Sequence, residues 1–259
     1  MAAHDARSTR PSAVGVHAGA VWMIRCRRLG QFSGRQSGEL MKCRFAALKE
    51  GAYANRTQLA GRSNLLWGLG THPGVEKSLA QFDTTSFCKL LPSFALVGEV
   101  GLDRRGHPIQ TEVFREILSA VANQPVILSV HSAGMCSAVL DEIERSPHPG
   151  IVLHWFNGTA ADIRRAVEMH CFFSVNAAMK HHVLEQIPMD KTLTETDFPS
   201  SMSRTRARRP GDVSAIESVL EQIHGGVARD HSWRNFSDLV ARSGVRDRLP
   251  PTIRDALCD

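Results

Sequence analysis

Short apolar runs recur along the chain from about residue 64, and each is followed by a segment whose apolar residues repeat at helical spacing. The expected strands are NLLWGLG (64–70), ALVGEV (95–100), PVILSVH (125–131), GIVLHWF (150–156), CFFSV (171–175) and KTLTET (191–196). The expected helices cover residues 77–91, 109–123, 134–145, 159–169, 178–187, 212–224 and 231–243. This alternation predicts βαβ units and a parallel sheet.

A chain of 259 residues is suited to one α/β barrel, a fold that typically takes about 250 residues. The pattern gives six clear strands, so a closed barrel of eight would need two more from residues 1–60. In that region only VGVH (14–17) makes a good strand candidate. We therefore predict a TIM-like (β/α) barrel whose first strand or strands are degraded or missing.

The positive charge of the chain is unevenly placed. Its formal net charge is +5, yet residues 1–50 hold nine Lys and Arg against three Asp and Glu, while residues 51–259 hold 22 against 23. The basic character therefore belongs to the first fifty residues and says little about the rest. We expect residues 1–50 to form an atypical basic segment, poorly ordered or altered at its start, and residues 51–259 to form a single domain.

Composition places the chain outside the membrane. No stretch approaches the roughly 18 consecutive apolar residues expected of a membrane span. The six cysteines form no CxxC or CxxH pair, which argues against a zinc knuckle or a dithiol redox centre. Reduced thiols are the simplest account, and they favour the cytoplasm.

Four side chains of metal-binding type stand at or near the ends of predicted strands: Glu99, His131, His154 and Asp197. Parallel strands of a barrel gather their carboxyl ends on one face, where carboxylates and imidazoles can hold divalent ions for hydrolysis. His131 and His154 are one βα unit apart, so neighbouring strands would present them side by side to share one ion. Glu99 could bridge two ions, and Asp197 could hold the second or take a proton from water. The competing interpretation of any one such histidine is a hydrogen-bonded structural residue.

Neighbouring positions add weaker candidates. Glu195 alternates with Asp197 and shares its face of the strand, whereas Asp103 is expected to cap the loop or helix after its own strand. His72, in GLGTHPG, either lines the mouth of the site or serves turn chemistry. A cluster after Asp197 either binds phosphates or is a solvated surface run; it comprises Arg204, Arg206, Arg208 and Arg209.

GEVGLD (98–103), SVHS (129–132), HWFNG (154–158) and TETDFP (194–199), with GTHP (70–73) upstream, together resemble the TatD family of metal-dependent hydrolases. The resemblance covers roughly residues 60–245. It implies a TIM-like barrel and a divalent-metal deoxyribonuclease using one or two Mg, Mn or Zn ions. By position, Glu99 resembles the bridging carboxylate, His131 and His154 the imidazoles on one metal, and Asp197 the carboxylate on the other. Asn235 and Phe236 fit the family's C-terminal helix, with a structural role.

Within the family, HWFNG, the ETD of residues 195–197 and the short body are most similar to QatD, the TatD-like member of the bacterial Qat anti-phage defence system. This implies DNA as substrate, an antiviral role and other Qat proteins as partners. By their own chemistry, Asp197 and Glu99 are the catalytic candidates. The candidates for substrate binding are His72, Arg204, Arg206 and Arg208.

Two features depart from the family pattern. The family begins with a strand ending in His-x-His, and the N-terminal region here has no such motif, so one ion would depend on Glu99 and Asp197. Ala133 stands where the family often has an arginine. The leading interpretation is a metal-dependent phosphodiesterase acting on DNA. The alternatives are a metal-depleted, non-catalytic relative that binds nucleic acid or a partner, and an amide or ester hydrolase.

Overall fold

The computed structural model describes residues 42–46, 65–198, 201–209, 211–226 and 228–257. Its centre is a parallel sheet whose seven strands lie side by side in chain order. The strands are β1 (Lys42–Ala46), β2 (Leu65–Leu69), β3 (Leu96–Gly101), β4 (Ile127–His131), β5 (Ile151–His154), β6 (Phe172–Val175) and β7 (Thr192–Thr194). Because every pair of neighbouring strands is parallel, all carboxyl ends of the strands meet along one edge of the curved sheet.

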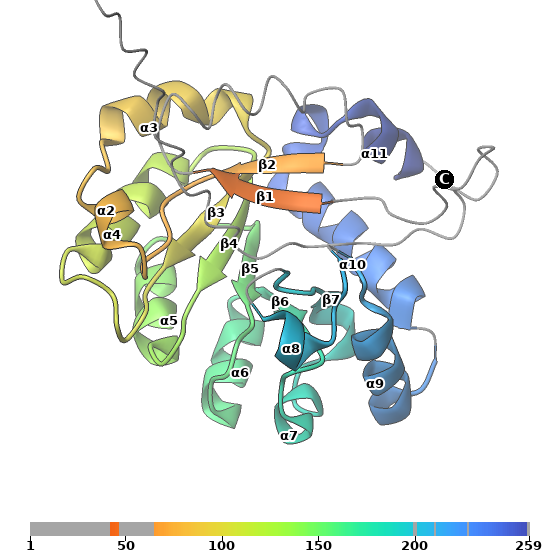
Figure 1. Cartoon of the computed structure of the whole chain (residues 1–259). Helices are drawn as coiled ribbons and strands as arrows, with labels where there is room; N and C mark the ends of the chain where they lie inside the picture. The colour runs from red at the N-terminus through yellow and green to blue at the C-terminus, as the bar shows by residue number, and fades with distance from the viewer. Residues whose placement is uncertain (1–41, 47–64, 199–200, 210, 227, 258–259) are drawn as a thin grey trace, which may run out of the picture.

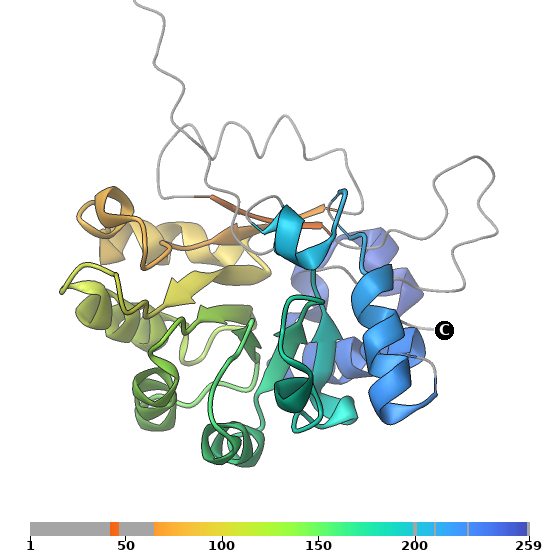
Figure 2. The same ribbon diagram turned by 60° about the horizontal axis from the view of Figure 1, so that its bottom comes forward.

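From β2 onward, helices link successive strands, and most of the helices lie along the outside of the sheet (Figures 1 and 2). They are α2 (Glu76–Leu79), α3 (Thr84–Leu90), α4 (Gln110–Val121), α5 (Cys136–Arg145), α6 (Ala160–Glu168), α7 (His181–Leu184), α8 (Met202–Thr205), α9 (Ser214–His224), α10 (Ala228–Ser243) and α11 (Pro251–Ala256). The 3₁₀ turns are η2 (Leu91–Ser93), η3 (Met189–Lys191) and η4 (Val245–Arg248). Among the described residues, no helix is long and apolar enough to cross a membrane.

The predicted α/β architecture and all six predicted strands are confirmed. A seventh strand, β1, lies inside the basic segment and pairs in parallel with β2, from Lys42 opposite Leu65 to Ala46 opposite Leu69. The alternative candidate VGVH (14–17) lies outside the described residues, as does most of the segment 1–50. The sequence pattern missed β1 because KCRFA mixes charged and apolar residues without a strand-length apolar run.

Two predicted helices are wrong in extent. Residues 77–91 form α2, α3 and η2 in place of one helix, because the Asp83 side chain accepts a hydrogen bond from the Ser86 N–H at 2.9 Å and starts a new helix. The expected helix 178–187 shrinks to the four residues of α7. Asn176 accounts for the later start, since its Oδ1 accepts from the Ala178 N–H at 3.0 Å and holds residues 176–178 in a turn.

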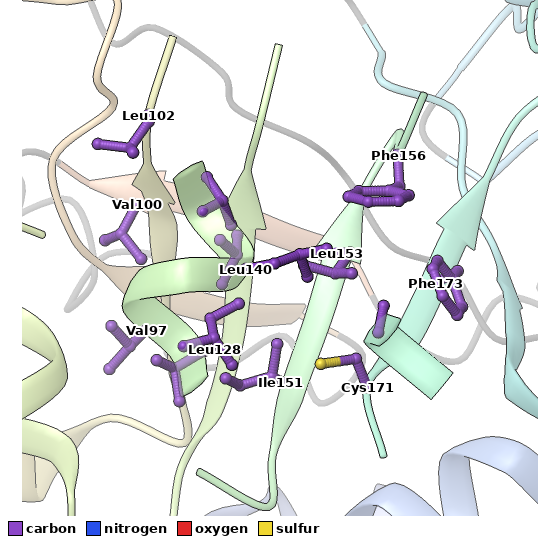
Figure 3. Close-up of a cluster of buried hydrophobic side chains, with 14 of the residues drawn as sticks. Val97, Val100, Leu102, Leu128, Leu140, Ile151, Leu153, Phe156, Cys171 and Phe173 are labelled. Atoms are coloured by element: carbon purple, nitrogen blue, oxygen red, sulfur yellow. The ribbon is translucent and has the colours of Figure 1, made fainter. Parts of the chain in front are cut away.

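The two faces of the sheet pack against different partners. Leu128, Leu153 and Phe173 point outward into a core shared with the strand-connecting helices, where Leu140 of α5 joins them (Figure 3). The opposite, inner face of the sheet packs on the C-terminal helices; this core contains Leu96, Ile127, Val152, Phe172, Leu193, Phe236, Leu239 and Val240. α10 therefore closes the inside of the sheet near the strands' amino ends.

Alternate residues of a strand share one face of the sheet. On the inner face, apolar residues near the amino ends of the strands are followed by polar residues at the carboxyl ends. Val152 is followed two residues later by His154, and Leu193 by Glu195 and then Asp197. Gly101 permits a close approach between β3 and β4, because a Cβ there would lie 2.2 Å from the His131 carbonyl oxygen. The register of β3 against β4 shifts between Val97 and Val100, across the segment that holds Glu99.

Candidate metal centre

Glu99 lies at the centre of the site, 3% exposed, and three imidazoles face one of its oxygens. Its Oε1 is 2.6 Å from His131 Nδ1, 3.6 Å from His154 Nε2 and 3.7 Å from His72 Nε2. His131 and His154 are direct partners in the register of β4 and β5, as predicted from their spacing. The bulged end of β3 thus places a buried carboxylate among side chains from three neighbouring strand ends.

His154 is held from behind by Glu195. The His154 Nδ1 lies 2.5 Å from Glu195 Oε2, which leaves Nε2 directed toward Glu99 and toward Asp197 Oδ1, at 3.7 Å. Glu195 is itself anchored, because the Ser174 hydroxyl donates to Oε2 and the Asn176 amide donates to Oε1 at 2.8 Å. Carboxylate–imidazole pairs of this kind fix the ring and its tautomer in metal sites.

His131 bridges two acidic groups, since its Nε2 lies 2.9 Å from Asp103 Oδ2 while its Nδ1 faces Glu99. Asp103 also accepts a hydrogen bond from the Arg105 N–H at 2.7 Å, so the expected loop cap is confirmed alongside a role in the site. His72 contacts both the turn and the site. Its Nδ1 accepts a hydrogen bond from the Gly74 N–H at 2.9 Å within the turn, and its ring centroid lies 4.6 Å from that of His131, with the two ring planes tilted by 60°.

The carboxylates and imidazoles of the site change one another's pKa values. Burial opposes ionisation of Glu99, but His154 and His131 outweigh it and lower the pKa of the carboxyl group. Burial also opposes the charged form of His154, yet Glu195 and Glu99 raise its pKa to about 10. Burial lowers the pKa of His72, the imidazole with the least carboxylate contact. The imidazoles therefore keep Glu99 ionised, and the neighbouring carboxylates favour the charged form of His154.

Asp197 differs from the other carboxylates. It is 8% exposed and adopts a left-handed backbone conformation, with φ of 47°, three residues after the end of β7. Burial raises its pKa to about 6, with His154 opposing and Glu195 adding to the rise. A carboxyl group whose pKa lies this close to neutrality is suited to accept and release a proton.

Among the described residues, His72, Glu99 and His131 form a group whose potential ligand atoms all lie within 4.8 Å of one another. His154, outside this group, lies 3.6 Å from the same Glu99 oxygen and 3.7 Å from Asp197 Oδ1. The set combines hard carboxylate oxygens with imidazole nitrogens, which is chemistry that fits a divalent cation. His72 therefore stands closer to the predicted ligands than its sequence context indicated.

The predicted substrate-binding arginines are exposed and lie on the loop after β7. The Arg204 guanidinium, on α8, stacks 4.8 Å from the Trp155 ring, and Trp155 directly follows His154. Arg206 ends α8 in a left-handed conformation, and the Arg208 N–H donates to Asp212. The structure thus brings Arg204 to the residue beside the site, whereas Arg206 and Arg208 have no described contact with the predicted ligands.

Sequence reasoning gave Glu195 only as a weak partner and did not find its support by Ser174 and Asn176. The available signal was the alternation of Phe172, Ser174 and Asn176, which places polar side chains on the inner face beside Glu195. Carboxylates and imidazoles at the carboxyl ends of the strands of a TIM-like sheet are the arrangement that metal-dependent hydrolases use.

The sequence model of the family described as TatD related DNase matches residues 30–239, which is most of the chain. The chain belongs to the TatD-related DNase family. This membership implies a divalent metal and agrees with the ligand chemistry around Glu99.

Among individual relatives, the chain is 29% identical over 140 residues to the uncharacterized metal-dependent hydrolase YabD of Bacillus subtilis, a match covering 49% of this chain and 55% of that protein. The chain thus spans about half the length of that relative. It is 26% identical over 235 residues to the 3'-5' ssDNA/RNA exonuclease TatD of Edwardsiella piscicida, covering 79% of this chain and 90% of that one.

Solved structures share the fold. The crystal structure of YJJV, a TatD homologue from Escherichia coli, superposes with a TM-score of 0.66 at 21% identity, over 76% of this chain and 85% of that one. A TatD family hydrolase from Entamoeba histolytica gives a TM-score of 0.61 at 16% identity, over 76% and 82% of the two chains. At these identities the likeness establishes the architecture alone.

Proposed function

We propose that this protein is a divalent-metal-dependent phosphodiesterase acting on DNA in the cytoplasm, with Mg²⁺, Mn²⁺ or Zn²⁺ held by Glu99, His131, His154 and Asp197. The observation that carries the proposal is the convergence of three imidazoles on Glu99 Oε1, at 2.6, 3.6 and 3.7 Å. When bound, a divalent ion supplies Lewis acidity toward a phosphoryl oxygen and toward water.

The protein's own residues have distinct tasks in this proposal. Glu195 and its two donors hold the His154 ring with Nε2 facing the site. Asp197, whose pKa is raised to about 6, is the group that accepts a proton from the attacking water. The absence of a His-x-His motif from the N-terminal region leaves Glu99 and Asp197 to hold any second ion, so we expect that ion to bind weakly.

Elemental mass spectrometry of the purified protein and Mn²⁺-dependent cleavage of single-stranded DNA test the proposal together. We expect bound metal, cleavage, and a loss of cleavage of at least about a hundredfold in Glu99→Gln and in Asp197→Asn. Asp190→Asn, an exposed carboxylate of η3, is the matched control and should keep full activity. Absence of metal together with equal activity in all variants would contradict the assignment.

The competing function is a non-catalytic relative that binds nucleic acid or a partner protein. The missing His-x-His favours it, because that motif is where alternate residues of one strand would place two imidazoles on one ion. Under this alternative the protein binds DNA, carries at most one weakly held ion and cleaves nothing. Two firmly bound ions per chain would exclude it.

We further propose a role in anti-phage defence with other Qat proteins as partners. The support is the combination of HWFNG (154–158) with ETD (195–197) in a short body. Expression together with the remaining Qat components should lower phage plating efficiency, and Asp197→Asn should abolish the protection. Protection that survives this substitution would separate the defence role from catalysis.

A further inference from the structure

A cavity of about 320 Å³ lies beside the metal centre, lined by Asp103, Arg104, Arg105, Ala133 and Gly134. Asp103 joins the cavity to the centre, because its Oδ2 is 2.9 Å from His131 Nε2. The cavity therefore begins where the proposed ligands end, on the loops that follow β3 and β4.

The two arginines supply the charge of this cavity. Arg104 and Arg105 are exposed, and within the part of the chain that the structure describes neither makes an ion pair with a carboxylate. The one acidic lining residue is already engaged, since Asp103 uses Oδ2 toward His131 and Oδ1 toward the Arg105 N–H. Among the described residues, no carboxylate thus compensates these two guanidinium groups, and guanidinium groups are the side chains best shaped to bind phosphate oxygens.

Hydrogen bonds hold the loop that carries Arg104 and Arg105 in one conformation. The Gln110 side chain, 8% exposed as a residue, accepts from the Asp103 N–H at 2.8 Å and donates to the Asp103 carbonyl at 2.9 Å. Gly106 makes room for it, because a Cβ there would lie 2.2 Å from Gln110 Oε1. The Arg104 N–H then donates to the Ala133 carbonyl at 3.0 Å, which extends the pairing of β3 and β4 into the loops.

Arg104 also depends on Gly134. Its aliphatic stem covers this glycine so closely that a Cβ at Gly134 would lie 2.8 Å from Arg104 Cδ, and the Gly134 φ of +70° already disfavours other residues. Gly134 lies two residues before α5, whose first turn has no acidic residue and no side-chain cap. Asp162 of α6 lies at this first turn, where its Oδ1 accepts from the Ser137 hydroxyl at 2.8 Å, so the positive charge of the pocket comes from the two guanidinium groups.

We propose that Arg104 and Arg105, with the turn at Ala133 and Gly134, form a phosphate-binding subsite that holds a nucleic-acid backbone phosphate next to the bond to be cleaved. This rests on the proposed function for its substrate class, and it adds the residues that position the strand. The subsite is tied to His131 through Asp103, so a phosphate bound there sets the register of the strand against the centre.

Binding without catalysis tests the subsite. Fluorescence anisotropy with a labelled single-stranded deoxyoligonucleotide, in EDTA and over a series of KCl concentrations, measures affinity and its salt dependence. We expect Arg104→Gln and Arg105→Gln each to weaken binding roughly tenfold and to lower the slope of log affinity against log salt by about 0.7. Arg164→Gln, an exposed arginine on α6, is the control and should match the wild type.

Three further arms make the result specific. Arg104→Lys should recover the salt slope with only part of the affinity, because an ammonium group replaces a forked donor by a point charge. The double variant Arg104→Gln/Arg105→Gln should lose affinity by the same factor for oligonucleotides with and without a 5′-phosphate, since the proposed ligand is a backbone phosphate. A methylphosphonate-substituted oligonucleotide should bind the wild type and the double variant alike.

The subsite is refuted if the double variant Arg104→Gln/Arg105→Gln binds as tightly as Arg164→Gln, or if the wild type does not bind single-stranded DNA. These outcomes are distinct from failure of the proposed function. Cleavage that continues with wild-type affinity and KM in the double variant would remove the subsite and leave the phosphodiesterase intact. Binding that depends on the two arginines, without any cleavage, would support the subsite and contradict the phosphodiesterase activity.

Discussion

His148, in the loop that enters β5, has hydrogen bonds at both ring nitrogens that select one neutral tautomer. Its Nε2–H donates to the Gln124 carbonyl at 3.1 Å, and its Nδ1 accepts from the Gly150 N–H at 3.0 Å. Protonation at Nδ1 would oppose the Gly150 N–H, and burial lowers the pKa of the ring. The free energy of unfolding should therefore depend on pH through His148.

We predict that the free energy of unfolding contains a part due to His148 that is complete above the unfolded pKa of about 6.5 and is lost as pH falls below it. The sign follows because the unfolded chain binds a proton there that the folded ring resists. His148→Asn keeps an acceptor for Gly150 and cannot titrate. Urea unfolding from pH 7.5 to 5.5 should show the wild type weakening relative to this variant, whereas exposed His182→Asn should show no such divergence.

Glu195 offers a second prediction at the residue scale, on the premise that His154 binds metal. Glu195→Gln preserves shape but removes the charge 2.5 Å from His154 Nδ1, and we expect metal affinity to fall about 10- to 100-fold. Isothermal titration with Mn²⁺ measures this effect. Glu217→Gln changes a glutamate that is also buried but pairs with Arg229, and it should leave metal affinity unchanged. Equal affinities in the two variants would argue against His154 as a ligand.

At the scale of elements, the side-chain amide of Asn235 bonds α10 to the sheet and the turn before β7. Asn235 Nδ2 donates to the Met189 carbonyl at 2.8 Å and to the Thr192 carbonyl at 2.7 Å, at the start of β7. The adjacent Phe236 fills the inner core. The structural role expected for these two residues thus has a physical basis, which is the docking of the C-terminal helix against the strand that leads to Asp197.

Asn235→Ala should lower the free energy of unfolding by about 1–3 kcal/mol, because two carbonyl groups lose a donor where water has little access. Urea denaturation measures the change. Asp238→Asn, on an exposed position of the same helix, is the control and should fall within about 0.5 kcal/mol of the wild type. Mn²⁺ affinity of folded Asn235→Ala should stay at the wild-type value, and a large drop would show that α10 does more than support the sheet.

At the scale of the whole molecule, Arg248 joins parts of the chain that are far apart in sequence. From η4, its Nη1 donates to the carbonyls of Leu91 and Phe94 at 3.3 and 3.2 Å, and its Nη2 donates to Gln124 Oε1 at 3.0 Å. One side chain therefore holds the C-terminal region to the segments that enter β3 and β4.

Arg248→Gln should lower the free energy of unfolding by about 1–3 kcal/mol, since the shorter amide cannot serve all three acceptors. Arg248→Lys should recover only part of this loss, because an ammonium group cannot reproduce the planar fork. Thermal unfolding followed by circular dichroism measures both. Arg164→Gln provides the exposed comparison, and a loss of similar size there would show that charge, not bridging, is responsible.

The period of apolar residues was sufficient to predict six strands, the parallel sheet and the presence of the helices between them, because each signal is local. His131 and His154 were also predictable as neighbours, since parallel register follows from one βα unit. The predicted helix ends were wrong where side chains such as Asp83 and Asn176 accept hydrogen bonds from nearby backbone N–H groups. β1 was not predicted, because its residue pattern is not typical of a strand and its hydrogen-bonded pairing with β2 stabilises it.

The sequence by itself determined the fold class and the kinds of side chain that reach the carboxyl edge of the sheet, since both follow from strand period and chain order. The tertiary structure decided how those side chains meet. Glu195 bonds to His154, Asp103 bonds to His131, and Arg104 lies over Gly134. Each of these contacts joins residues at least 28 positions apart, and each depends on the twist of the sheet and the paths of its loops. No local pattern in the sequence encodes that geometry.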